Sequence, residues 1–109
     1  MAKISGSGWK LWLSVLQNVR RQGVLTNTKV AELQGISFSW ASQLLDWMSH
    51  AGLVKGVRRG SEPVVYSLTG KGLEFLGSYE EHIIGKGKFL KMREELQELK
   101  RVYVRRSKK

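Results

Sequence analysis

Few residues in this chain of 109 have the types and spacing that catalysis or metal binding requires. His50 and His82 each stand alone, with no partner at the spacing of a metal site. The run Glu80–His82 suggests acid–base chemistry, but such a run more commonly forms a solvated helix face. Gly70–Gly72 and Gly85–Gly87 each enclose a lysine, yet neither matches the phosphate-binding loop motif. We therefore expect no catalytic residue, no metal and no cofactor, and a protein that is not an enzyme.

The charged residues instead favour a polyanionic partner. Lys and Arg number 19 against 9 Asp and Glu, a net charge of +10, which suggests nucleic acid first and an anionic membrane surface second. The excess is uneven, because residues 1–85 hold nine basic and six acidic residues, whereas residues 86–109 hold ten and three. There is no cysteine, no membrane-length apolar run and no apolar signal core. We expect an intracellular, cytoplasmic and nucleoid-associated protein that binds double-stranded DNA and no membrane.

The elements that must position these charges follow from hydrophobic periodicity and turn residues. Gly23 and Gly35 end the first two helices, and Ser37 and Thr69 can cap later ones. We expect a hinge at 85–87. The predicted order is helix 9–22, helix 28–34, helix 38–50, strand 53–59, turn 60–63, strand 64–68, helix 70–84 and helix 88–105.

The apolar residues of each helix predict which face it buries. The third helix has a stripe of four that lie within about 100° of one another. Trp40 and Trp47 flank this stripe, and we expect both to be buried at the flank of the core, packed on the first helix or the wing, with base stacking as the alternative. The expected inward residues are Val30, Ala31 and Leu33 in the second helix, Ala41, Leu44, Leu45 and Met48 in the third, and Leu73, Leu76, Ile83 and either Tyr79 or Glu80 in the fourth.

Three stretches in this order resemble a winged helix-turn-helix. Thr28–Ser37 resembles the second helix and its turn, and 42–54 resembles the recognition helix and its exit. Val65–Gly72 is similar to the Y-x-L-T-x-x-G sequence that closes the wing in many small regulators. The resemblance covers about 9–84 and is to PadR-like, MarR-like and archaeal small winged-helix regulators. It implies a mainly α fold with a small β-hairpin wing (α+β), followed by a C-terminal dimerisation helix.

The same resemblance, with the geometry of a major groove about 12 Å wide, implies the DNA-contacting residues. Polar residues of the third helix would read bases, and Gln43 can bind adenine through two hydrogen bonds. Asp46 either accepts from cytosine or lies off the DNA. The alternative is that all of these are ordinary solvated side chains. The expected contacts are Lys29, Ser37, Ser39, Ser42, Gln43, Lys55, Arg58 and Arg59.

The last helix carries an apolar seam at heptad spacing, which predicts dimerisation. Glu95 would face Lys100 of a partner in a parallel pair, but two heptads do not decide between parallel and antiparallel. The alternative is that this helix folds back on its own domain. The expected organisation is a leader 1–8, a domain 9–84, a dimerisation helix 85–105 and a basic tail 106–109. The expected dimerisation residues are Trp9, Trp12, Phe89, Met92, Leu96, Leu99 and Tyr103.

These observations predict a sequence-specific, homodimeric DNA-binding protein, a transcriptional regulator. One alternative is an architectural, chromatin-like protein with little sequence preference, because the reading face is short and uncharged. Another is a protein-interaction module without a nucleic-acid partner, against which the basic excess argues.

Overall fold

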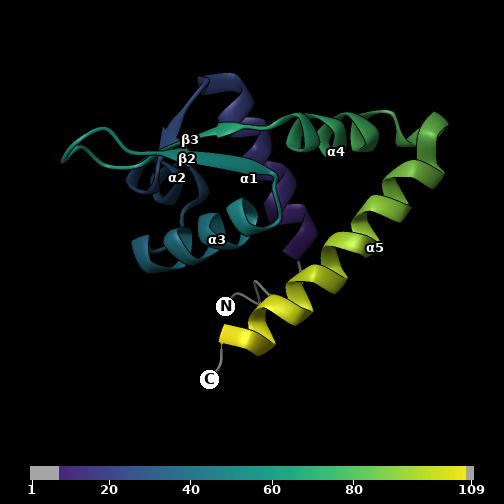
Figure 1. Cartoon of the computed structure of the whole chain (residues 1–109). Helices are drawn as coiled ribbons and strands as arrows, with labels where there is room; N and C mark the ends of the chain where they lie inside the picture. The colour runs from purple at the N-terminus through teal and green to yellow at the C-terminus, as the bar shows by residue number, and fades with distance from the viewer. Residues whose placement is uncertain (1–7, 108–109) are drawn as a thin grey trace.

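The computed structural model describes residues 8–107, without the side chains of 82–86 and 105–107. The expected leader lies outside this part of the chain except for Gly8, which begins the first helix, and so does the end of the expected tail. The elements are α1 (Gly8–Gln22), β1 (Leu25–Thr26), α2 (Asn27–Gln34), α3 (Phe38–His50), β2 (Val54–Val57), β3 (Val65–Leu68), α4 (Gly70–Glu80) and α5 (His82–Ser107) (Figure 1).

The three strands form one antiparallel sheet in the order β1-β3-β2. Leu25 pairs with Tyr66 across β1 and β3, and Val54 pairs with Leu68 across β2 and β3. The predicted hairpin is confirmed, and its connecting loop projects away from the helices (Figure 1). The segment Leu25–Thr26, which falls between the predicted helices 9–22 and 28–34, adds a third strand because β3 still has a free edge for it.

Helix ends follow the local chemistry of the sequence. The hydroxyls of Thr26, Ser37 and Thr69 accept hydrogen bonds from the first-turn amides of α2, α3 and α4. Each satisfies a backbone donor that the helix itself leaves unpaired. Gly35 ends α2 at φ 66°, a left-handed conformation that glycine adopts at little cost. The caps at Ser37 and Thr69 and the stop at Gly35 are therefore confirmed.

The core lies between α1, α3, α4 and one face of α5. The predicted stripe of α3, Ala41, Leu44, Leu45 and Met48, is buried throughout. The prediction of burial is wrong for two other residues, because Leu33 and Leu73 are 43% and 48% exposed. In α4 the buried face is formed by Gly72, Phe75 and Leu76, about 100° from Leu73. Gly72 packs against the backbone of Leu53, and a glycine adds nothing to a hydrophobic pattern. The pattern therefore predicts the buried face of α4 on the side of Leu73, which the structure shows to be exposed.

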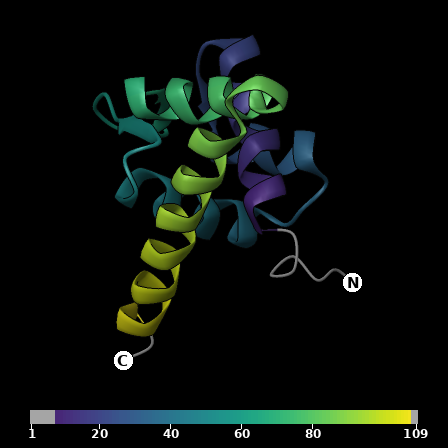
Figure 2. The same ribbon diagram turned by 90° about the vertical axis from the view of Figure 1, so that its right-hand side faces the viewer.

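The junction between α4 and α5 also differs from the expectation. The predicted hinge at 85–87 lies inside α5, and α4 ends at Glu80 instead of continuing to residue 84. Glu81 makes the turn, and its amide bonds the carbonyl of Gly77. Glycine tolerates many backbone conformations, helical ones included, so Gly85 and Gly87 do not break α5. From this turn α5 doubles back past α4 and runs beside the body of the domain (Figures 1 and 2).

Candidate nucleic-acid interface

The outward side of α3 presents a row of polar residues, here called the polar face: Ser39, Ser42, Gln43, Asp46 and His50. Ser42 is half-buried and the other four are exposed. Two hydrogen bonds involve its members, because Asn27 Nδ2 donates to Ser42 Oγ at 2.8 Å and Gln43 Nε2 donates to Ser39 Oγ at the longer distance of 3.4 Å. The helix itself is fixed by its buried stripe and by the Ser37 cap. The sequence had predicted Ser39, Ser42 and Gln43 as a group, and they do lie on one face.

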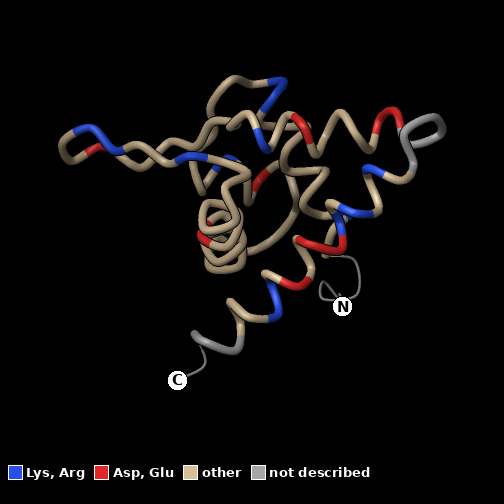
Figure 3. The backbone as a smooth tube through the Cα atoms, turned by 45° about the vertical axis from the view of Figure 1, so that its right-hand side comes forward, with Lys and Arg blue, Asp and Glu red and all other residues tan. Residues whose placement is uncertain are grey.

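The hairpin of β2 and β3, the wing, carries a second group of candidates. Lys55, Arg58 and Arg59 are exposed, and no ion pair joins any of them to another described residue. Figure 3 shows the basic residues at the tip of the wing, beyond the helices. Because Arg58 and Arg59 have no ion-pair partner among the described residues, the wing offers two guanidinium groups that are free to bind an anion. The two strands of the wing approach closely at Gly56, where a Cβ would stand 2.9 Å from the ring of Tyr66.

The other two predicted contacts are placed differently. Lys29 lies in α2, where its amine is 3.5 Å from Glu32, so part of its charge is already balanced. Ser37 is exposed, but its hydroxyl accepts from the amide of Trp40 as the cap of α3. Ser37 thus has a structural role whatever else it contacts.

The two tryptophans of α3 have different surroundings. Trp47 is 1% exposed and packs against Trp12, with ring centroids 5.5 Å apart, so the core prediction is confirmed for it. Trp40 is half-buried and lies outside the core cluster. Its ring lines a groove on the surface of the domain while its indole nitrogen is buried, so Trp40 is only partly buried and has one side open to the groove.

The apolar seam of α5 packs against its own domain, which is the alternative that the sequence left open. Phe89 and Leu96 are 3% and 1% exposed. Phe89 contacts Trp9 at 5.6 Å and Phe75 at 5.6 Å between ring centroids. Trp12 is buried in the same core, whereas Leu99 remains 39% exposed. Most of the predicted dimerisation residues are therefore occupied within the chain.

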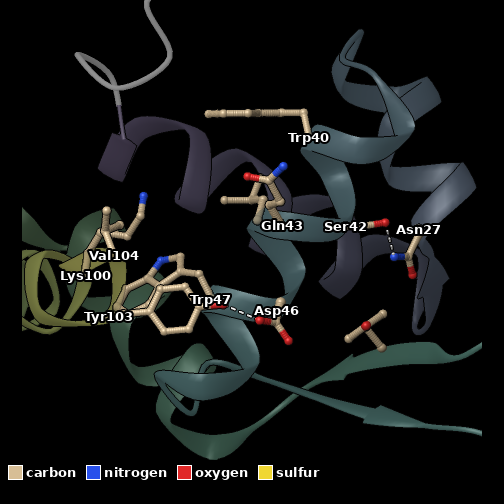
Figure 4. Close-up of a pocket in the computed structure, with 11 residues that line it drawn as sticks. Asn27, Trp40, Ser42, Gln43, Asp46, Trp47, Lys100, Tyr103 and Val104 are labelled. Carbon is tan, nitrogen blue, oxygen red and sulfur yellow. Dashed lines mark hydrogen bonds between the residues drawn. The ribbon is translucent and has the colours of Figure 1, made fainter. Parts of the chain in front are cut away.

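The end of α5 and the polar face of α3 enclose a groove of about 770 Å³ (Figure 4). Tyr103 donates a hydrogen bond to Asp46 across one end of it. Lys100 lies 5.7 Å and 5.8 Å from the rings of Trp12 and Trp47. The groove is lined by Asn27, Trp40, Ser42, Gln43, Leu44, Asp46, Trp47, Tyr66, Lys100, Tyr103 and Val104.

The electrostatics of the groove follow from these contacts. The hydrogen bond to Asp46, helped by burial, raises the pKa of Tyr103 to about 12. Burial between the two tryptophans lowers the pKa of Lys100. Burial, with a smaller effect of the Asp46 charge, raises the pKa of Tyr66. The sequence predicts Lys100 only as a residue of a dimer interface. Lys100 and Tyr103 are three positions apart on α5, and this spacing indicates that both side chains lie on the same side of the helix.

The described residues were also compared with the requirements of a membrane-spanning helix and of a metal site. Among residues 8–107, no helix is long and apolar enough to cross a membrane. In the described part of the chain, no three His, Cys, Asp or Glu side chains come together in a way that could hold a metal ion.

Comparison with known proteins places the fold. No protein-family model and no curated protein sequence matches the chain. Among solved structures, a MarR variant from E. coli in complex with operator DNA aligns at a TM-score of 0.58 with 17% identity, over 78% of this chain and 59% of that one. ZitR from Lactococcus lactis aligns at 0.56 with 26% identity, over 82% and 66%. Rv1404 from Mycobacterium tuberculosis aligns at 0.62 with 17% identity, over 78% and 58%.

The chain therefore has the winged helix-turn-helix fold seen in regulators of the MarR type, as the sequence resemblance implied. It spans about three fifths to two thirds of the length of these three structures. In this fold α2 and α3 form the helix-turn-helix, and β2 and β3 form the wing.

Proposed function

We propose that this protein binds double-stranded DNA as a sequence-specific homodimer and acts as a transcriptional regulator. The observation that carries the proposal is the combination of the exposed polar face of α3 with the unpaired arginines of the wing in one winged helix-turn-helix. The MarR structure with operator DNA shows that a protein of this fold binds DNA. The net charge of +10 supports the same partner.

The polar face supplies the expected sequence recognition. A major groove about 12 Å wide admits one α-helix, and the side chains near its N-terminal end contact base edges. Gln43 would bind the edge of an adenine through its amide, and Ser39 and Ser42 would bind several acceptors. The Asn27–Ser42 hydrogen bond positions Ser42 before DNA arrives, whereas Gln43 is exposed and can turn its amide from Ser39 to a base.

The wing and the amino end of α2 supply affinity without sequence information. Arg58, Arg59 and Lys55 would contact phosphates or the minor groove, and Lys29 would contact a phosphate after leaving Glu32. Each phosphate contact releases counterions, so binding should weaken steeply with salt.

Dimerisation would place two recognition helices about 34 Å apart, on half-sites one turn of DNA from each other. Because the seam of α5 is filled within the chain, the surface left for a second copy is the outer side of α5. Its exposed apolar side chains are Leu90 and Val102, each with 40% of its area exposed, and both point away from the buried Phe89 and Leu96. Light scattering of the wild type and of a variant with Leu90→Lys and Val102→Lys tests this, because the variant should be a monomer.

Selection of bound duplexes from a random pool tests the sequence-specific function. The wild type should enrich one motif, and Gln43→Ala should broaden it at one or two positions while overall affinity falls little. Lys91→Ala, an exposed residue of α5 outside the polar face and the wing, is the matched control and should leave the motif unchanged.

An architectural role is the second candidate, favoured by the small, uncharged side chains that dominate the polar face. In that case random DNA would compete as well as any selected duplex, and the selection would return no motif.

A further inference from the structure

The helix α5 has two parts that are held very differently. Its first part is anchored to the domain by the buried Phe89 and Leu96 and by an ion pair of 3.2 Å between Lys88 and Glu74 of α4. In its last turns Tyr103 is only half-buried, and Val102 and Val104 are 40% and 42% exposed. The groove of about 770 Å³ separates these last turns from much of α3. The end of α5 is therefore more exposed than the anchors Phe89 and Leu96 of its first part.

These last turns lie against the polar face of α3. The ring of Tyr103 is 5.0 Å from His50 and 5.7 Å from Trp47, and its hydroxyl donates to Asp46. At 100° per residue, Asp46 and His50 point within about 40° of Ser39, which lies at the middle of the exposed side. Figure 4 shows Tyr103 and Lys100 facing the polar face from across the groove. The end of α5 thus contacts Asp46 and His50 in the carboxyl half of the polar face, which remain exposed, and it leaves the amino half open.

A second helix at this position conflicts with entry into DNA. One α-helix with its side chains is about 10–12 Å in diameter, and the major groove is about 12 Å wide and 8.5 Å deep. It accepts α3 alone, and α3 with another helix beside its polar face is too broad.

We propose that the last two turns of α5 are an autoinhibitory element, which Tyr103 fastens to Asp46 and which must leave α3 before the polar face enters the major groove. This inference rests on the proposed DNA-binding function. Opening leaves the buried anchors Phe89 and Leu96 in place, and it uncovers the ring of Trp47 beside Tyr103. Opening also returns the desolvated Lys100 to water, which favours its charged form. Residues 100–109 hold six Lys and Arg, so the released segment would itself be attracted to DNA phosphates.

A reversible crosslink tests the mechanism directly. The chain has no cysteine, so Asp46→Cys and Tyr103→Cys introduce the only two thiols. A short bifunctional maleimide with an internal disulfide would tie α5 to α3, and a reducing agent would release it. The crosslinked protein should lose DNA binding, and the same protein should regain it after reduction. The matched control is Glu94→Cys with Gln97→Cys, an exposed neighbouring pair within α5 outside the basic segment, and its crosslink should leave binding unchanged.

The outcomes separate this inference from the proposed function. If the reduced protein and the wild type do not bind DNA, the proposed function is wrong. If both bind and the crosslinked protein binds equally well, the autoinhibitory role is wrong.

A conservative substitution gives an independent readout. Tyr103→Phe keeps the ring and removes the hydroxyl that donates to Asp46, so the closed form loses stability and DNA should bind up to about tenfold more tightly. Tyr79→Phe removes a hydroxyl from the α4 side of the domain, where its ring packs against Phe89 at 5.3 Å, and should leave affinity unchanged. Unchanged or weaker binding by Tyr103→Phe would overturn the inference.

Discussion

Replacing Gly72 with alanine should destabilise the protein, whereas the same change at Gly77 in the same helix should not. A Cβ on Gly72 would stand less than 3.0 Å from the carbonyl oxygen of Leu53 and 3.2 Å from Leu68 Cδ2. A Cβ on Gly77 would meet no atom within 4 Å. The two substitutions are chemically identical, so their difference isolates the close approach of α4 to the start of β2.

The expected loss of stability follows from the atoms that a Cβ on Gly72 would displace. The carbonyl of Leu53 accepts from both the amide and the hydroxyl of Thr69, at 3.2 Å and 3.1 Å, so displacing it strains the cap of α4. Overpacking costs about 1–3 kcal/mol, and each weakened hydrogen bond adds about 0.5–1.5 kcal/mol. The better helix propensity of alanine returns about 1 kcal/mol. The expected net loss is about 1–5 kcal/mol for Gly72→Ala, against a gain of up to about 1 kcal/mol for Gly77→Ala.

Urea unfolding followed by tryptophan fluorescence measures both free energies, because Trp12 and Trp47 are buried in the core. The slope against urea should stay constant, so the midpoints alone should report the difference. Equal stability of the two variants would refute the packing described for α4.

Further predictions concern the core, a cap and an ion pair. Leu45→Ala in the buried stripe of α3 should cost about 2–5 kcal/mol, while Leu33→Ala on the exposed side of α2 should stay within about 0.5 kcal/mol; equal losses in urea unfolding would contradict the assignment of the two faces. Ser37→Ala should cost about 1 kcal/mol by removing the cap of α3, and a lost cap should also appear as faster amide exchange at Trp40. Arg20 bonds Glu80 at 2.6 Å and lowers the pKa of that carboxyl. The stabilisation from this pair is therefore present above the ordinary value of 4.5 and is lost as pH falls through the lowered pKa. Glu80→Gln should be less stable than the wild type at neutral pH and equal to it in acid, and a pH-independent difference would argue against the ion pair.

The sequence predicts those parts of the fold that depend on short-range chemistry. The helix α3 is an example, because its four-residue stripe and the Ser37 cap both come from neighbours in the chain. The same holds for the wing, where turn residues separate two alternating segments. The polar face followed from the stripe, since residues opposite a buried stripe must face outward.

What the sequence missed depends on contacts between distant elements. The burial of Gly72 and the exposure of Leu73 are decided by how closely α4 approaches Leu53. The seam of α5 has the spacing of a dimer helix, but spacing does not say which surface will cover it. Here that surface is the aromatic cluster around Trp9 and Phe75, in the same chain.

The central claim is that the polar face and the wing bind double-stranded DNA, and the salt dependence of binding tests it most directly. Fluorescence anisotropy with a labelled duplex at several salt concentrations gives both the affinity and the slope of its logarithm against log salt. The account predicts tight binding at low salt with a steep slope, and a slope reduced by about two in the variant carrying Arg58→Ala and Arg59→Ala. Absence of binding at low salt, or an identical slope in that variant, would contradict it.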